Sequence, residues 1–429
     1  MSICDMNYRD ALEYLYQLRL FGTKLGLENV RHLSHALGNP QKRLRFIHVA
    51  GTNGKGSVCA YLNEIYQLAG FKTGMFTSPH LVRFGERLQI NGKMIPDDRL
   101  AQLVSNVRKK LPELPNEITP TFFEFLTCMA LKYFADQKCE LVIWETGMGG
   151  RLDATNLVEP ECSIITNVSY DHQAWLGDSL QKIASEKAGI IKKNKPVVTG
   201  ADQAEVLEVI HQKSKEQNAP LNVICADEIS TDLDTGLKGP HQALNATIAK
   251  KAIELLQNQF PVSDAEMIQG IERTQLPGRF QSLHWRGRKV ILDVAHNLAG
   301  YEALVTNCQE EFSDEKCELI FASLDDKPWK EGLRKLLPFC QKIHFLPANS
   351  KRSTGVEAMK GYADTLLGSQ SSIQVHTHEN LESCLIHIAN PSNKPVLVTG
   401  SFYLVGDALS VLQNRDRSEN SLNEWGAKL

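Results

Sequence analysis

Short apolar runs alternate along this chain with longer amphipathic stretches, and this alternation restricts the possible folds more than any other feature. The short runs have the length of buried strands, and the longer stretches have helical spacing. The runs cover residues 45–49, 72–77, 140–145, 162–167, 196–199 and 221–225, and the helical stretches include 58–69, 122–136, 180–191 and 204–216. The pattern predicts a mainly parallel sheet covered by helices on both faces.

The alternation is interrupted at Pro277 and Gly278, after two further helical stretches at 241–257 and 263–273. It then resumes, with strands expected at 289–293, 317–322, 342–346 and 395–399 and helices at 299–311, 329–337, 379–388 and 405–413. We therefore expect an α/β protein of two domains. Residues 1–283 would form a phosphate-loop (P-loop) domain with a mainly parallel sheet, and residues 284–429 a smaller Rossmann-like α/β domain.

Composition and charge exclude several classes of protein. Lys plus Arg total 47 and Asp plus Glu total 50, so the formal net charge is −3, and no dense basic run occurs. Such a chain has no electrostatic basis for binding nucleic acid or an anionic membrane. It has no stretch of about 18 apolar residues, and its acidic N-terminal region does not resemble a signal peptide. We expect a cytoplasmic monomer that binds small molecules.

A glycine-rich loop joins the strand expected at 46–50 to a helix expected from Val58 onward. Its glycines let the backbone turn tightly and approach phosphate oxygens, and the helix N-terminus offers unpaired N–H groups to an anion. Lys55 adds positive charge near the β- and γ-phosphates, and Ser57 can reach a magnesium ion. The expected nucleotide-binding residues are Gly51, Thr52, Asn53, Gly54, Lys55, Gly56 and Ser57.

This loop is a variant of the common phosphate-binding pattern. Val49 stands where the first glycine is usual, and Gly56 separates Lys55 from Ser57. A glycine-rich structural turn is the alternative, but a lysine and a serine between a strand and a helix favour phosphate binding. The loop alone does not separate a kinase, a GTPase switch and a ligase.

Further polar residues recur after the expected strands. Ser78 and His80 follow the strand at 72–77, and Glu145 ends the strand at 140–145. Asp171 and His172 follow the strand at 162–167, and Lys187 lies on the next helix. Open α/β sheets bind ligands at the carboxyl ends of their strands. Each residue alone could be a turn, surface or solvated side chain, whereas their joint placement favours a magnesium site beside the phosphate loop.

Ten motifs in order, spread over essentially the whole chain, resemble the folylpolyglutamate synthase/dihydrofolate synthase family, which belongs to the Mur-ligase superfamily. They are FIHVAGTNGKGS (46–57), TSPHL (77–81), TFFEFLT (121–127), ETGMGGRLDATN (145–156), DH (171–172), EKAGIIK (186–192), HQALNA (241–246), PGRFQ (277–281), LDVAHN (292–297) and VTGSFYLVGDAL (398–409). Departures from the family pattern are small, such as Met148 and Val294 where Leu and Gly are common.

The resemblance implies an ATP-dependent ligase that joins an acid to an amino acid. In this family ATP activates a carboxylate as an acyl phosphate, the amine of L-glutamate attacks it, and ADP and phosphate leave. The carboxylate belongs to dihydropteroate in one reaction and is the γ-carboxylate of a folate glutamate in the other. The residues leave open which of the two reactions, or both, this chain catalyses.

The resemblance also implies roles for the residues at the strand ends. Ser78 and Glu145 would hold one magnesium ion, which Ser57 of the loop can also reach, and His172 would hold a second near the γ-phosphate. Lys187 matches a lysine that the family carries as a carbamate. An ammonium group has no lone pair to ligate a cation, so the carbamate explains a lysine in this ring of ligands.

Residues farther along the chain complete the implied site. Asn245, Arg279 and Asp293 match ATP contacts of the family, and His296 is a candidate to contact the incoming glutamate or the acyl phosphate. The expected catalytic residues are thus Lys55, His172, Lys187 and His296. Three segments match family contacts to the pteroate, although the two phenylalanines could equally be core aromatics: Leu25, Gly26 and Leu27; Thr121, Phe122 and Phe123; Leu152, Asp153 and Ala154.

Two alternatives remain from the sequence. Another amide ligase of the Mur type would share the loop and the ring of ligands, but it usually carries a UDP-binding domain before the loop. Only about 50 residues precede Gly51 here, too few for such a domain. A nucleotide-dependent switch could also use a phosphate loop, but it would have no need of Lys187 or of the LDVAHN segment.

Overall fold

The strand and helix alternation is present in the computed structural model, which describes residues 6–22, 26–229, 234–313, 315–368, 371–389 and 394–413. The chain forms two compact units. The first comprises residues 1–80, 84–236 and 242–275, and the second comprises residues 81–83, 237–241 and 276–429. Among the described residues, no helix combines the length and apolar character needed to cross a membrane.

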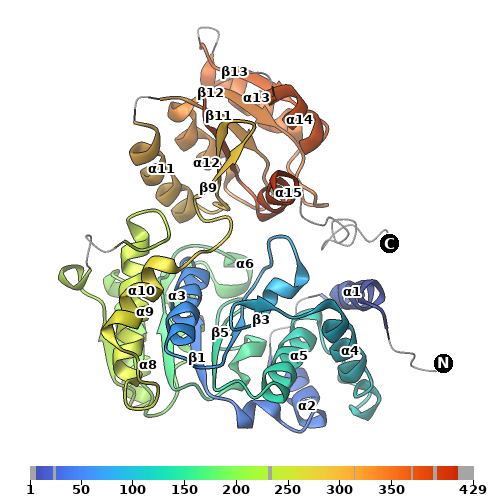
Figure 1. Ribbon diagram of the computed structural model, residues 1–429, viewed down its shortest axis with the longest axis vertical. Helices are drawn as coiled ribbons and strands as arrows, with labels where there is room; N and C mark the ends of the chain where they lie inside the picture. The colour runs from blue at the N-terminus through green and yellow to red at the C-terminus, as the bar shows by residue number, and fades with distance from the viewer. Residues whose placement is uncertain are drawn as a thin grey trace. The chain divides into compact units, whose positions relative to one another are not determined.

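Within the described residues, the first unit is built on an eight-stranded sheet with the order β4-β3-β2-β5-β1-β6-β7-β8 (Figure 1). In this order, each neighbouring pair from β2 through β5, β1, β6 and β7 to β8 is parallel. Strands β3 and β4 add an antiparallel edge beside β2. The strands are β1 Phe46–Ala50, β2 Thr73–Phe76, β3 Leu88–Ile90, β4 Lys93–Met94, β5 Leu141–Glu145, β6 Cys162–Ile165, β7 Val197–Thr199 and β8 Leu221–Val223.

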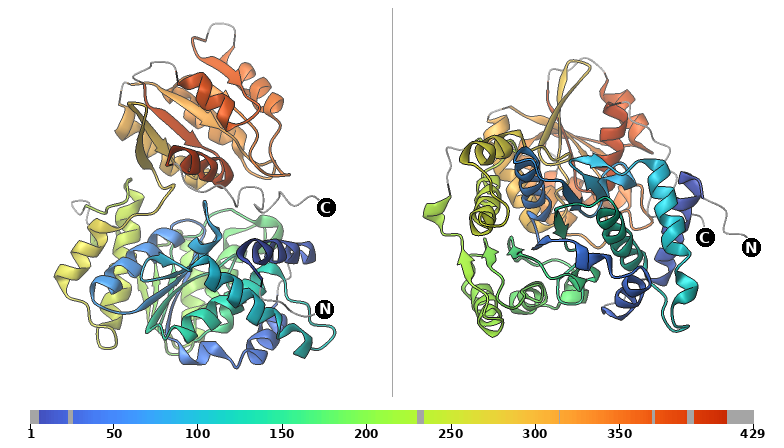
Figure 2. Two further views of the ribbon diagram at one scale, coloured as in Figure 1. Left: turned by 45° about the vertical axis from the view of Figure 1, so that its right-hand side comes forward. Right: turned by 60° about the horizontal axis from the view of Figure 1, so that its bottom comes forward.

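The helices of the first unit pack on this sheet and on one another. They are α1 Tyr8–Gln17, α2 Glu28–Ala36, α3 Lys55–Leu68, α4 Asp97–Arg108, α5 Phe122–Asp136, α6 Gln173–Leu176, α7 Leu180–Ala188, α8 Ala204–Glu216, α9 His241–Leu256 and α10 Asp264–Arg273. Helix α3 contacts the central strands and α10. Helices α1 and α4, which the sequence reading omitted, pack side by side, as Figure 2 shows in blue and cyan.

The second unit has a six-stranded sheet within its described residues, with the order β13-β12-β11-β14-β10-β9. It is parallel except for β9, which pairs antiparallel with β10. Its elements are β9 Gln281–Trp285, β10 Arg288–Leu292, α11 Leu298–Phe312, β11 Cys317–Phe321, α12 Trp329–Leu336, β12 Cys340–Phe345, α13 Val356–Leu367, β13 Gln374–Thr377, α14 Leu381–Ile388, β14 Val396–Thr399 and α15 Phe402–Leu412.

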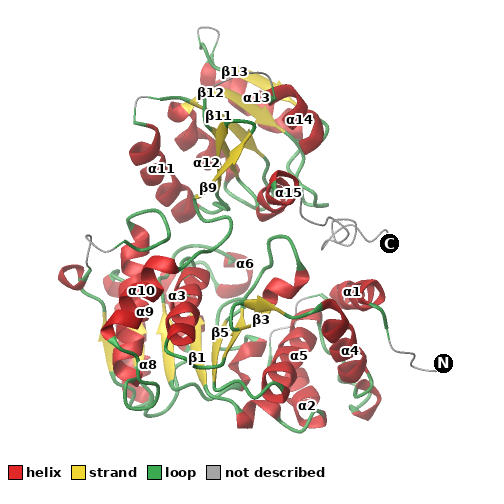
Figure 3. Cartoon of the chain, viewed as in Figure 1, coloured by secondary structure: helices red, strands yellow, loops and turns green. Residues whose placement is uncertain are grey.

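Alternating strand residues build two cores in the second unit. One face of the sheet carries Leu292 and Val398 and packs on α14 and α15 through side chains such as Leu385. The other face carries Ile291 and packs on α11, α12 and α13. Figure 3 shows the yellow sheet between these two groups of helices. Both faces are therefore buried, as expected for a mainly parallel sheet.

The mainly parallel α/β class predicted from the sequence is confirmed, with shifts at the ends of elements. Helix α3 begins at Lys55 rather than at Val58. The compact units divide between residues 275 and 276, because β9 at residues 281–285 pairs with β10 and so belongs to the second sheet. The functional boundary expected at residues 283 and 284 stays a prediction.

A buried histidine in the central strand makes the first unit sensitive to acid. His48 is fully buried in β1, where its Nε2 lies 3.0 Å from the Thr155 hydroxyl. Burial, with a smaller contribution from nearby Lys192, lowers the pKa of His48 to about 3. In the unfolded chain the pKa is about 6.5, so the unfolded state binds more protons between pH 6.5 and 3. Stability is therefore lost as the pH falls below 6.5.

We predict that replacing His48 by Leu removes part of this acid sensitivity. At pH 5 the protonation of unfolded His48 costs the native state about 2 kcal/mol, from 1.36 kcal/mol per pH unit below 6.5. Between pH 7.5 and 5, the wild type should therefore lose about 2 kcal/mol more free energy of unfolding than His48→Leu. Urea unfolding at both pH values measures this, and an equal loss in the two proteins would contradict it.

Candidate active site

The glycine-rich loop leaves β1 and enters α3 directly, so Lys55, Gly56 and Ser57 form the first turn of the helix. The N–H groups of a first turn have no intrahelical acceptor, which makes this turn an anion-binding surface. Gly54 has a φ of +81°, and a Cβ there would lie 2.5 Å from Asn245 Oδ1. A Cβ on Gly51 would lie 1.8 Å from the Thr166 hydroxyl. Both glycines are therefore required by their surroundings.

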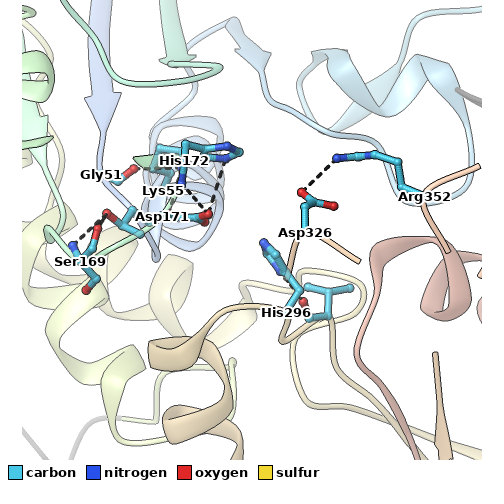
Figure 4. A network of polar contacts seen from close by, with 10 residues as sticks. Gly51, Lys55, Ser169, Asp171, His172, His296, Asp326 and Arg352 are labelled. Atoms are coloured by element: carbon cyan, nitrogen blue, oxygen red, sulfur yellow. Dashed lines mark hydrogen bonds and ion pairs between the residues drawn. The ribbon is translucent and has the colours of Figure 1, made fainter. Parts of the chain in front are cut away.

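The segment after β6 holds the loop in place. The Thr166 hydroxyl donates to the carbonyl of Asn53 (2.6 Å), and the Asn53 N–H donates to Asn167 Oδ1 (2.9 Å). The Ser169 N–H donates to the Thr52 hydroxyl, which donates to the Ser169 carbonyl (Figure 4). Sequence reasoning missed these supporting residues. The signal was the three polar residues Thr166, Asn167 and Ser169 directly after a buried strand.

Lys55 lies back over its own loop. Its ammonium donates to the carbonyls of Gly51 (3.0 Å) and Thr52 (3.2 Å). Asp171 and His172 also belong to this part of the first unit (Figure 4), and the His172 N–H donates to Asp171 Oδ1. His172 has a φ of +52° and a side chain about half exposed, so its imidazole is accessible to a ligand.

Glu145 and Ser78 come together at the ends of the neighbouring strands β5 and β2. Glu145 is almost fully buried, and its Oε2 accepts a hydrogen bond from the Ser78 N–H at 2.8 Å. The same carboxylate and Lys55 both act electrostatically on the buried Cys59 of α3. The structure thus places two of the predicted magnesium ligands together beside the helix that carries the loop. His80 differs, because its Nδ1 accepts from Arg87 at 2.7 Å.

Lys187 is a buried lysine in a charged environment. Its side chain is 3% exposed, and burial lowers its pKa to about 7, with the nearby Lys55 acting in the same direction. Asp171 and Asp153 act in the opposite direction. A substantial share of this amine is therefore unprotonated near neutral pH. An unprotonated amine is a nucleophile, whereas an ammonium group is not.

Asn245 of α9 also reaches the loop. It is buried, its Oδ1 lies against Gly54, and its Nδ2 donates to Gln242 Oε1 at 3.0 Å. The predicted residues Lys55, Ser57, Glu145, Lys187 and Asn245 therefore all belong to the same edge of the first unit.

The remaining predicted nucleotide contacts lie in the second unit, Arg279 just before β9 and Asp293 just after β10. Asp293 is buried and accepts from the N–H groups of Phe280 and Ala295, both at 2.9 Å. Burial raises the pKa of Asp293, and the Arg279 guanidinium opposes that rise. The Phe402 ring has two neighbours here. Its centre lies 5.6 Å from the Arg279 guanidinium and 5.2 Å from the centre of the His296 ring. Phe402, at the start of α15, was missed because an aromatic residue there reads as core.

Several residues in the segments predicted to contact pteroate also stabilise the local structure. Thr121 caps α5, and Phe122 stacks on Tyr16 beneath the Arg19 guanidinium. Phe123 fills the space that a Cβ on Gly147 would need. Asp153 is buried and accepts from the Met148 N–H, so it shapes the loop after β5. Gly26, Leu27 and Leu152 are half-buried and Ala154 is buried, whereas Leu25 lies outside the described residues.

The comparison with known proteins agrees with this arrangement. Residues 49–227 match the family model described as the Mur ligase middle domain. A dihydrofolate synthase/folylpolyglutamate synthase of Bacillus subtilis is 34% identical over 426 residues, covering 93% of this chain and 98% of the relative. The chain belongs to the dihydrofolate synthase/folylpolyglutamate synthase family. A dihydrofolate synthetase of Saccharomyces cerevisiae is 32% identical and covers 90% of this chain and 98% of its own.

Solved structures of this family share the fold. A folylpolyglutamate synthase from Thermotoga maritima has a TM-score of 0.84 and 32% identity, covering 96% of this chain and 98% of its own. Escherichia coli FolC in complex with DHPP and ADP has a TM-score of 0.84 and 29% identity, covering 95% and 98%. The resemblance predicted from the motifs is confirmed. Members of the folylpolyglutamate synthase/dihydrofolate synthase family are ATP-dependent ligases.

The contact between Gly51 and Thr166 generates a prediction about nucleotide binding. In Gly51→Ala the new methyl group displaces the Thr166 hydroxyl and with it the loop. We expect the affinity for ADP to fall on the order of tenfold or more, equivalent to at least about 1.4 kcal/mol. Isothermal titration calorimetry measures the change.

A matched control is available in α13. A Cβ at Gly361 meets nothing within 4 Å, so Gly361→Ala should bind ADP as the wild type does. Equal ADP affinity in the Gly51 and Gly361 variants would show that the loop tolerates the methyl group, contrary to the prediction.

Proposed function

We propose that this chain is an ATP-dependent ligase that joins the amino group of L-glutamate to a carboxylate of dihydropteroate or of a folate γ-glutamate. The observation that carries the proposal is the common edge where the first turn of α3 meets the buried Glu145 and Lys187. Its family membership supports the choice of substrates, since relatives are named for both reactions.

The reaction needs negative charge to be stabilised at one place. The acceptor carboxylate attacks the γ-phosphorus of ATP, an acyl phosphate forms, and ADP leaves. The glutamate amine then attacks the acyl carbon, loses a proton, and phosphate leaves as the amide forms. Lys55 and the N–H groups of the first turn of α3 would stabilise the charge that develops on the phosphoryl oxygens, which is usually the largest catalytic contribution.

The donor set fits magnesium. Ser57, Ser78 and Glu145 offer hydroxyl and carboxylate oxygens, the hard ligands that magnesium prefers, and Glu145 is a buried carboxylate that accepts a hydrogen bond from the Ser78 N–H. These residues would hold one ion, and His172 would contribute to a second. A bound magnesium ion supplies positive charge that neutralises the phosphates.

Lys187 is proposed to react with carbon dioxide. Its unprotonated amine adds to the carbon of carbon dioxide, and one proton is released as the carbamate forms. The product carries a carboxylate-like group in place of a cation. Burial favours this modification because it favours the unprotonated amine at Lys187.

In the second unit, Arg279 and Asp293 are proposed to contact ATP, and His296 the glutamate or the acyl phosphate. The His296 Nδ1 lies 2.9 Å from the carbonyl of Val294, so a neutral ring carries its proton on Nδ1. This orientation leaves Nε2 as the acceptor nitrogen of the ring.

The nine cysteines of the described chain are all free, which supports a reducing, cytoplasmic location. The monomeric state stays a prediction.

The proposed function is tested by the release of ADP from ATP with magnesium. Release should require both L-glutamate and either dihydropteroate or a tetrahydrofolate, assayed side by side. A nucleotide switch would instead hydrolyse ATP without glutamate, and another Mur-type ligase would need a different acid. Full-rate ADP release in the absence of glutamate would reject the ligase.

In Lys55→Ala the glutamate-dependent rate should fall on the order of 100-fold or more.

The Lys187 carbamate makes a second prediction. Lys187→Ala should lose most activity, and a short-chain carboxylic acid should restore part of it by occupying the space of the carbamate. Lys182 lies on the same helix, is exposed and pairs with Asp178, so Lys182→Ala is the matched control and should keep its activity. Absence of rescue, together with an unmodified mass in bicarbonate, would exclude the carbamate without excluding the ligase.

A further inference from the structure

Four histidines and a cysteine gather in the second unit, where the ligase reaction described above uses none of them. They are His344, His376, His378, Cys384 and His387, called here the histidine cluster. The ring centres of His344 and His376 are 5.2 Å apart, as are those of His344 and His378. His387 lies 4.6 Å from His376 and 5.3 Å from His378 by the same measure.

The fold brings the cluster together from three elements. Strands β12 and β13 are parallel with His344 opposite His376, and the His378 N–H continues the pairing by donating to the Phe345 carbonyl. His376 and His378 are two residues apart, so they share a face of the strand. Cys384 and His387 are three residues apart on α14 and share a face of that helix. His-x-His on a strand and Cys-x-x-His on a helix thus converge.

The donor atoms already lie at distances close to those of a metal site. His344 Nδ1 lies 3.0 Å from His378 Nε2. Ligand atoms of His344, His378 and Cys384 all lie within 4.8 Å of one another. In a tetrahedral zinc site, bonds of about 2.0–2.3 Å place neighbouring donors roughly 3.3–3.6 Å apart. Small side-chain rotations would therefore bring these three residues into ligand positions.

A buried carboxylate stands behind His344. His344 is fully buried, and its Nε2 has no hydrogen-bond partner among the described residues. That nitrogen lies 3.8 Å from Glu318 Oε2, and the buried Arg288 holds the same carboxylate at 3.2 Å. Histidines that bind metals almost always present their second nitrogen to a carboxylate or carbonyl. Glu318 is thus placed to orient His344, with Nδ1 toward His378.

We propose that His344, His378 and Cys384 bind one transition-metal ion of the zinc class, with His387 as the next available donor. Imidazole and thiolate are the ligands that zinc and its neighbours prefer, whereas magnesium prefers oxygen. The chemistry of this site therefore differs from that of Ser57, Ser78 and Glu145. The bound ion would be structural, joining α14 to β12 and to the residue after β13.

Zinc binding to the full chain tests the proposal. The untagged protein, freed of metal with EDTA, is titrated with Zn²⁺ in excess Mg²⁺, which occupies the oxygen ligands. We expect one Zn²⁺ per chain with a micromolar or lower Kd, and a higher Tm with zinc, because a ligand of the native state stabilises it. His378→Gln should weaken binding at least tenfold and lose the Tm increase.

Cobalt identifies the sulfur ligand. Co²⁺ should give the near-ultraviolet charge-transfer band of a cobalt–thiolate bond, and Cys384→Ser should remove it. Cys225 and His211 are exposed residues outside the cluster, so Cys225→Ser and His211→Gln should bind both metals as the wild type does. No zinc binding at tens of micromolar, equal binding by His378→Gln, or a cobalt spectrum unchanged in Cys384→Ser would each overturn the proposal.

Discussion

The close approach of Gly51 to Thr166 is the constraint on which the candidate active site depends. Strands β1 and β6 are parallel neighbours with Ala50 opposite Ile165, so the segments that follow these two strands leave the sheet side by side. Because Gly51 has no side chain, the Thr166 hydroxyl can reach the carbonyl of Asn53. This contact sets the path of the loop and hence where α3 begins. The direction in which its first N–H groups point follows from that path.

Buried charge at the same edge explains why the site would bind ions of both signs. A buried carboxylate is costly unless it is paired or hydrogen-bonded, and Glu145 has a backbone donor in Ser78. A buried ammonium at Lys187 is costly too, as its lowered pKa shows. A cation beside Glu145 would offset the cost of that carboxylate, and a carbamate at Lys187 would remove the buried ammonium and give the cation a second negative partner. The proposed magnesium ion and carbamate are therefore complementary.

The sequence pattern predicted the parallel sheets because buried strands and amphipathic helices are local signals. It predicted Glu145 at the end of a strand and Lys187 on a later helix, and the structure has both there, since strand ends and helical spacing can be read from the chain. It could not reveal the support that Thr166 gives to Asn53, because these residues are 113 positions apart and meet only through strand pairing. The start of α3 was placed three residues late because glycine and serine weaken a helical pattern.

The second unit shows how polar groups within a buried sheet can position a helix. Arg288 and Glu318 form a buried pair, and such pairs contribute little net stability because both charges lose their hydration. Arg288 also donates to the carbonyl of Ile388, the last residue of α14. The pair thus holds the C-terminal end of that helix, while Glu318 also faces His344. Cys384 lies one turn before Ile388 on the same helix. The buried Glu318 carboxylate therefore lies beside both Arg288, which bonds to the end of α14, and His344, which lies near Cys384. Apolar residues of equal volume would pack there but would not define its position along the sheet.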